Sequence, residues 1–146
     1  MFGDILRKLT QPQPATLPDD DARLALTALL VRIARADNDY AEAEIARIDQ
    51  INMARHGLSP FEAAKLRGEA EAMEVEAPDT VRFTRAIKDA VAHEDRIGVI
   101  EALWQVVLAD GARDHEEDAV VRLVSNLLGI NDRDSALARQ RVANAR

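Results

Sequence analysis

The chain has 146 residues, of which 47% are apolar and 31% are charged, and it contains no cysteine. This composition is typical of one globular domain with a sizeable core, and the lack of cysteine excludes disulfides and thiolate metal ligands. The formal charge of −7 argues against a nucleic-acid binder, because that kind of binding depends largely on basic side chains that neutralise phosphates.

The first eighteen residues are predicted to be an N-terminal segment and proline-rich linker, followed by a helical domain over residues 19–146. Four apolar residues with helical spacing favour a short amphipathic helix at the very start: Phe2, Ile5, Leu6 and Leu9. Three prolines then separate this helix from the domain, so we expect residues 1–18 to add little to stability. Neither a cleavable signal nor a membrane span is recognisable, and a cytoplasmic location is therefore expected.

Helical patterns fill the remainder of the chain. Alanine and leucine dominate the apolar residues, which favours helices over strands. We expect helices that begin near residues 19, 40, 60, 79, 96, 115 and 132. The predicted fold is an all-α, single-domain bundle of about seven to eight helices.

Two of these helices are expected to lie at the centre of the bundle. The segments Ala25–Ala36 and Val99–Ala109 are apolar nearly all round, whereas the other helices have one apolar face. In the helix that begins near residue 115, the residues expected to face inward are Val120, Val124 and Leu127.

An internal repeat relates Leu30–Ile51 to Leu103–Val124 by a shift of 73 positions without a gap. Each copy has an apolar helix that ends in Ala-Asp, and a glutamate seven positions after the aspartate opens a second amphipathic helix. The polar pairs are Asp37 with Glu44, and Asp110 with Glu117. The two units are predicted to pack with their central helices face to face, as a pseudo-twofold pair.

This duplicated pattern resembles the signature of the tellurite-resistance TerB family. The resemblance rests on Ala36-Asp37-Asn38 followed by Glu44 and on Ala109-Asp110-Gly111 followed by Glu117, and it covers roughly residues 19–130. It implies a small all-helical fold, a role in stress response or tellurite resistance, and metal binding through the paired acids. Asn38 replaces the usual glycine, and it also tolerates a left-handed backbone.

The acids have two interpretations. In the first, the glutamates complete helix caps, with Asp39 and Glu42 in the first unit and Asp114 and Glu117 in the second. The second interpretation starts from the aspartates, which lie at helix C-termini where the dipole disfavours a carboxylate. If the units meet about a pseudo-dyad, four carboxylates form an oxygen-only site suited to Ca²⁺ or Mg²⁺: Asp37, Glu44, Asp110 and Glu117.

Two functions therefore remain, and an enzyme is not expected because no nucleophile–base pair or cofactor loop is recognisable. The first is a TerB-like stress-response module that binds a divalent cation. The second is a metal-independent adaptor that docks a protein partner, with a membrane contact through residues 2–9 as a variant. Two basic patches offer docking surfaces for an acidic partner: Arg82, Arg85 and Lys88, and a tail with Arg133, Arg139, Arg141 and Arg146.

Overall fold

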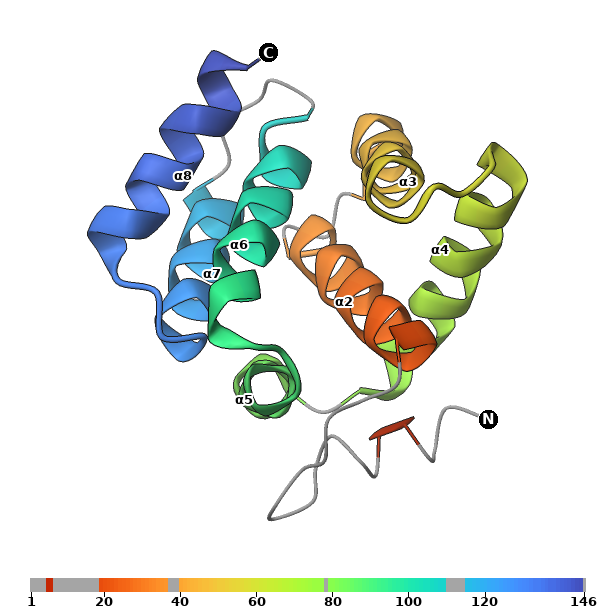
Figure 1. The fold of residues 1–146 in the computed structure, drawn as a ribbon, viewed down its shortest axis with the longest axis horizontal. Helices are drawn as coiled ribbons and strands as arrows, with labels where there is room; N and C mark the ends of the chain where they lie inside the picture. Colours follow the sequence, from red (N-terminus) through yellow and green to blue (C-terminus); the bar gives the residue numbers. More distant parts are fainter. Residues whose placement is uncertain (1–4, 7–18, 37–39, 78, 110–114, 146) are drawn as a thin grey trace.

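The structure is a computed structural model that describes residues 5–6, 19–36, 40–77, 79–109 and 115–145. The described residues form helices and contain no strand, which confirms the all-α prediction (Figure 1). The helices are α2 (Asp19–Ala34), α3 (Glu42–His56), α4 (Pro60–Glu76), α5 (Thr80–Ala90), α6 (His93–Val107), α7 (His115–Leu127) and α8 (Asp132–Asn144). Within this part of the chain, none of the helices has the length and apolar character needed to cross a membrane.

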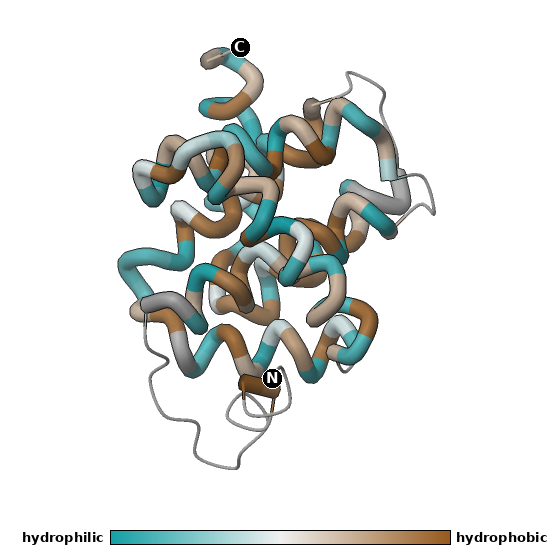
Figure 2. Tube along the Cα trace, turned by 90° about the vertical axis from the view of Figure 1, so that its right-hand side faces the viewer, coloured by the Kyte–Doolittle hydropathy of each residue, from teal (hydrophilic) through white to brown (hydrophobic). Residues whose placement is uncertain are grey.

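The helices α2 and α6 lie side by side in the middle of the bundle (Figure 1). Between Leu24 and Ala34, α2 buries every residue except Leu26 and Arg32, which are half-buried. Seven residues of α6 are buried, from Val99 to Val107. This confirms the prediction that these two helices are central. Figure 2 shows apolar and polar residues interspersed along the trace of the bundle.

The helices form two triplets connected by α5. In the first triplet α2, α3 and α4 contact one another, and in the second α6, α7 and α8 do the same. Across the triplets α2 contacts α6 and α7, and α3 contacts α6. These cross contacts bring the second helix of each triplet against the first helix of the other.

A glycine turn connects the last two helices of each triplet. Gly57 and Gly129, which are 72 positions apart, have φ angles of 65° and 81° and end α3 and α7. This left-handed backbone favours glycine. One apolar residue follows, and then the N-cap residue of the next helix, Ser59 or Asn131. The repeat found in the sequence therefore extends to a third helix. The pseudo-twofold axis itself stays a prediction.

Side-chain caps begin three of the helices, α4, α5 and α8. The Ser59 hydroxyl accepts the Glu62 N–H at 3.1 Å, and the Glu62 carboxylate accepts the Ser59 N–H at 3.0 Å, with proline at the first helical position. Asp79 caps α5 and Asn131 caps α8 through the same kind of hydrogen bond. Each cap supplies an acceptor to a backbone N–H that has no partner inside its helix.

Two details of the helix prediction are wrong. The sixth helix begins at His93 instead of near Arg96, and its first turn contains Glu94 and Asp95, whose charges favour a helix N-terminus. On α7 the buried stripe is Val121, Val124 and Ser125, continued by Leu128 directly after the helix. The half-buried Val120 packs against the core as predicted, whereas Leu127 is half-buried and lies beside this stripe. The inward face of this helix was difficult to predict from the sequence because one of its residues, Ser125, is polar.

The N-terminal segment contributes to the core, contrary to expectation. Ile5 is 8% exposed and belongs to the hydrophobic core, and the half-buried Leu6 packs against it. Burial of an isoleucine side chain stabilises the folded state by about 1.5–3 kcal/mol. The expectation that residues 1–18 add little to stability is therefore wrong at Ile5, while Phe2 and Leu9 lie outside the described residues.

Candidate functional site

Glu44 is the predicted cation ligand whose side chain the structure describes. Asp37 and Asp110 lie outside the described residues, and Glu117 is described only as part of the α7 backbone. The described residues contain no group of three histidine or acidic side chains that could hold a metal ion. The four-carboxylate site therefore remains a prediction, and Glu44 is the part of it whose surroundings can be examined.

Glu44 occupies the first turn of α3 and is 1% exposed. Its carboxylate accepts the backbone N–H of Ala41 at 3.2 Å, which is the glutamate half of a capping box. The N-cap residue is thus Ala41, so the predicted cap by Asp39 and Glu42 is wrong. Glu42 is the first residue of the helix and is exposed.

Capping alone does not account for the burial of Glu44. Glu62 holds the corresponding position in α4 and makes the same hydrogen bond, yet its side chain is exposed. Burial of a carboxylate opposes folding unless hydrogen bonds or opposite charge compensate it. Glu44 is therefore an acid placed inside the protein at the position that the duplicated motif singles out.

A polar network holds the helices on both sides of the first acidic turn. At the end of α2, the Arg35 guanidinium lies 5.1 Å from the centre of the Tyr40 ring and 3.2 Å from the Glu74 carboxylate of α4. Arg67 of α4 bonds Asp49 of α3 at 2.8 Å and lies 3.5 Å from Glu71. These contacts join the end of α2 and the body of α3 to the same helix, α4.

The electrostatics of this network favour neutral Tyr40 and charged Arg67. Burial, and then the nearby Glu71 carboxylate, raise the pKa of Tyr40 well above its usual value. The hydrogen bond to Asp49 raises the pKa of Arg67. Partly buried charges of opposite sign lie within ion-pair distance here, so the network ties α3 and the end of α2 to α4. We call its residues the clamp: Arg35, Tyr40, Asp49, Arg67, Glu71 and Glu74.

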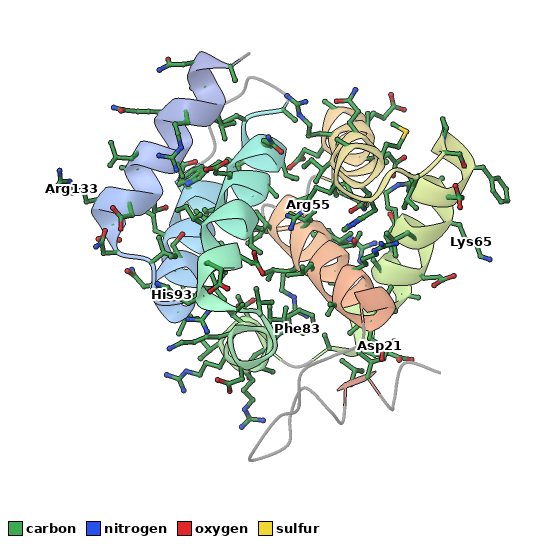
Figure 3. The ribbon with its side chains drawn as sticks, viewed as in Figure 1. Asp21, Arg55, Lys65, Phe83, His93 and Arg133 are labelled. Atoms are coloured by element: carbon green, nitrogen blue, oxygen red, sulfur yellow. The ribbon has the colours of Figure 1, made fainter. Side chains whose placement is uncertain are left out.

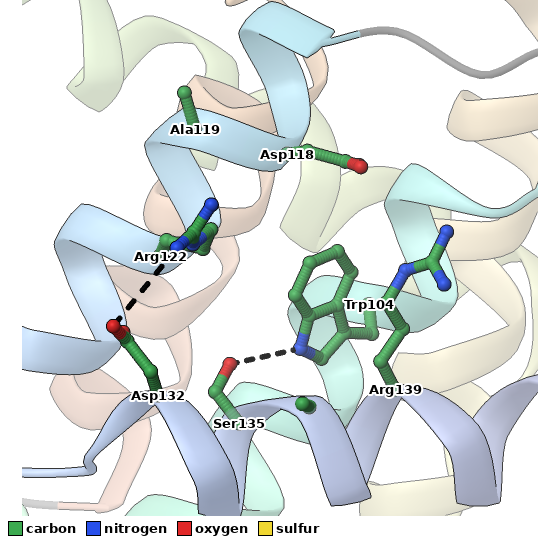
Figure 4. A pocket seen from close by; sticks show the side chains of 8 residues that line it. Trp104, Asp118, Ala119, Arg122, Asp132, Ser135 and Arg139 are labelled. Carbon is green, nitrogen blue, oxygen red and sulfur yellow. Dashed lines mark hydrogen bonds and ion pairs between the residues drawn. The ribbon is translucent and has the colours of Figure 1, made fainter.

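The second triplet contains an open groove. An open cavity of about 600 Å³ lies between α7 and α8 over the Trp104 ring of α6 (Figure 4). Its charged residues are Asp118, Arg122, Asp132 and Arg139. Arg122 and Arg139 flank Trp104 on opposite sides. Sequence reasoning assigned Arg139 to a basic docking patch, but it did not find Arg122 or Trp104.

The two predicted basic patches differ in how free their side chains are. In the tail, Arg141 pairs with Glu101 of α6 at 2.9 Å, whereas Arg133 projects away from the bundle (Figure 3). On α5, Arg82 and Arg85 are exposed, and Lys88 is half-buried. The same helix directs Phe83 inward, under the Arg32 guanidinium of α2 at 5.4 Å. The basic edge of α5 is therefore the outer face of an amphipathic helix.

Comparison with known proteins gives one match. A protein-family model described as tellurite resistance protein TerB matches residues 23–140, which is most of the chain. No curated protein and no solved structure matches. The matched range contains both acidic turns, the clamp and the groove.

Proposed function

We propose a function from one premise: the chain belongs to the tellurite-resistance TerB family. It acts as a stress-response module of that family and binds one divalent cation through its two acidic turns. The ligands are Asp37 and Glu44 from the first unit and Asp110 and Glu117 from the second. The observation that supports this proposal most strongly is the burial of the Glu44 carboxylate, which is 1% exposed.

The donor set fits a hard cation. All four side chains supply oxygen, which Ca²⁺ and Mg²⁺ prefer, and the chain has no cysteine to attract a softer metal. Each aspartate follows the first helix of its triplet and each glutamate opens the second, so cation binding would draw these helix ends together. A change in their relative position is the signal that such a module would pass to a partner.

Melting curves test the proposal. The wild-type protein is first measured in EDTA and then with millimolar Ca²⁺, Mg²⁺, Mn²⁺ or Zn²⁺ at constant ionic strength. A cation that binds only the folded state at a hundred times its Kd stabilises that state by about 2.7 kcal/mol, because the unfolded chain cannot hold the acids together. For a chain of this size, the melting temperature rises by about 5–10 °C.

The chain offers a matched pair of variants for this experiment. Glu44→Gln removes the charge of the buried acid, and Glu42→Gln removes the same charge from the exposed acid two positions earlier in the same turn. We expect Glu44→Gln and Asp110→Asn to abolish the cation response and Glu42→Gln to keep it. A wild-type protein that responds to none of the four ions would contradict the proposal.

A further inference from the structure

Sequence shifts relate two residues of the clamp to two residues of the groove. Arg67 of α4 corresponds to Arg139 of α8 by the 72-position shift that relates the two glycine turns. Asp49 of α3 corresponds to Arg122 of α7 by the 73-position shift of the acidic repeat. By these shifts, the second helix carries an acid in the first triplet and a base in the second.

Arg139 lacks the acidic partners that Arg67 has in the first triplet. Arg67 has Asp49 at 2.8 Å and Glu71 at 3.5 Å. Arg122 replaces the first of these acids, and Ala143 occupies the position that corresponds to Glu71. Within the described residues Arg139 makes no ion pair or hydrogen bond, and its buried Nε has no acceptor. Its guanidinium instead lies 5.4 Å from the centre of the Trp104 ring.

Besides Arg139, the charged side chains of the groove are Asp118, Arg122 and Asp132. Arg122 and Asp132 are 3.9 Å apart, and their side chains are 65% and 60% exposed. An exposed ion pair at this distance contributes little to stability, so the carboxylate of a ligand can replace Asp132 as the partner of Arg122 with little loss of stability. Trp104 lies beneath, 3% exposed, with its indole N–H directed to Ser135 and one ring edge toward the groove (Figure 4).

We propose that this groove binds an acidic segment of a partner protein. Carboxylates of the segment pair with Arg139 and Arg122, and the chain between them passes over the edge of Trp104 that lines the groove. The partner's acids thereby occupy the place that Asp49 and Glu71 hold in the first triplet. Arginine suits this role because its planar donors match a carboxylate and its face stacks on an aromatic ring. This inference does not depend on the cation site.

The test uses the full chain and a hexaglutamate peptide as the probe, with EDTA present so that cation binding plays no part. A fluorescent label on the peptide reports binding by anisotropy. Trp104 is the single tryptophan of the chain, so its emission reports whether the peptide reaches the groove. We expect a saturable rise in anisotropy together with a change in Trp104 emission, and no binding of a hexaglutamine peptide.

Three variants that each remove one positive charge locate the site. Arg139→Gln and Arg122→Gln should each weaken hexaglutamate binding at least about tenfold, because charge-assisted hydrogen bonds are lost. Arg133→Gln, on the outer side of α8, should leave the affinity within about twofold. Arg122 is exposed, so its variant keeps the test valid even if Arg139→Gln does not fold.

Several results would overturn the inference. They are the absence of saturable binding, equal binding of hexaglutamine, and equal weakening by Arg133→Gln, which would show attraction by charge alone. A separate titration with inorganic phosphate distinguishes a small-oxyanion pocket. If phosphate changes Trp104 emission and the peptide does not bind, the groove is not a docking site for a protein segment.

Discussion

Trp104, Ser125 and Ser135 form a chain of hydrogen bonds inside the second triplet. The indole N–H of Trp104 donates to the Ser135 hydroxyl at 3.2 Å, and the two serine hydroxyls are 3.1 Å apart. Ser125 donates onward to the Val121 carbonyl at 2.8 Å. All three side chains are buried, and they join α6, α7 and α8. The sequence shows only that neither serine has a nucleophile motif around it, because their burial depends on how three distant helices pack.

This chain of hydrogen bonds makes a prediction about Ser135. Ser135→Ala leaves the buried indole N–H of Trp104 without an acceptor, so the free energy of unfolding should fall by about 1–3 kcal/mol. Urea denaturation followed by circular dichroism measures the change. In a Trp104→Phe background there is no indole N–H, and the same serine substitution should cost clearly less. Equal costs in the two backgrounds would show that the hydrogen bond does not stabilise the fold.

At the scale of helices, most starts and ends could be predicted from local chemistry. Ser59 with Glu62, Asp79, Gly57 and Gly129 mark helix ends by rules that need only a few neighbouring residues. The sequence does not predict which faces of the helices contact one another. The inward stripe of α7 contains a serine, and the difference between clamp and groove appears only when α3 with α4 is compared with α7 with α8.

The candidate sites could be predicted to different degrees. The duplicated motif singled out Glu44, and the structure buries it. The position of the capping box was wrong, because Ala41 has no side-chain cap and the sequence gives no reason to place an N-cap there. The sequence did not predict that Trp104 and Arg122 line one groove, because they lie on different helices. The alignment of the repeat does place Arg122 at the position of Asp49, and this difference in charge is visible in the sequence.

The clamp between α2, α3 and α4 makes a prediction about pH. Burial and Glu71 raise the pKa of Tyr40, so the unfolded chain ionises this phenol at a lower pH than the folded protein does. The stability that neutral Tyr40 contributes is present below about pH 10, the unfolded value, and is lost as the pH rises through the folded value. Tyr40 is the single tyrosine of the chain, so the phenolate absorbance reports the ionisation of this residue alone.

We expect that absorbance to rise above its usual pH range, together with the loss of helical circular dichroism. Between pH 9 and the transition, Tyr40→Phe should lose less stability than the wild type, because it has no phenol to ionise. A phenolate that forms at its ordinary pKa in the native protein would contradict the burial of Tyr40 in the clamp.

At the scale of the whole molecule, the N-terminal segment and the helical domain are linked by Ile5. Deletion of residues 2–17 removes a core side chain, so it should lower the melting temperature by at least about 4 °C. Ile5→Ala alone should lower the free energy of unfolding by about 2 kcal/mol. Phe61→Ala is the control, because that large apolar side chain is 78% exposed and its loss should have little effect. An unchanged melting temperature in Ile5→Ala would show that Ile5 does not stabilise the fold and that the N-terminal segment is only a linker.

The two proposed binding sites lie at different places in the fold. The acidic turns connect the first and second helices of each triplet, whereas the groove lies between the second and third helices of one triplet. Under the two proposals, a cation and a partner bind at different places. Glu117 and Arg122 are five residues apart on α7, so the proposed cation site and the groove share this helix.

The central claim is that both acidic turns share one cation, and the stoichiometry of binding tests it most directly. Calorimetric titration of Ca²⁺, and separately Mg²⁺, into metal-free protein should give one cation per chain. Asp37→Asn and Asp110→Asn should each abolish that single binding event, although the two positions are 73 residues apart. Two cations per chain, one of them lost in each variant, would show two separate sites. No binding of either ion would contradict the account.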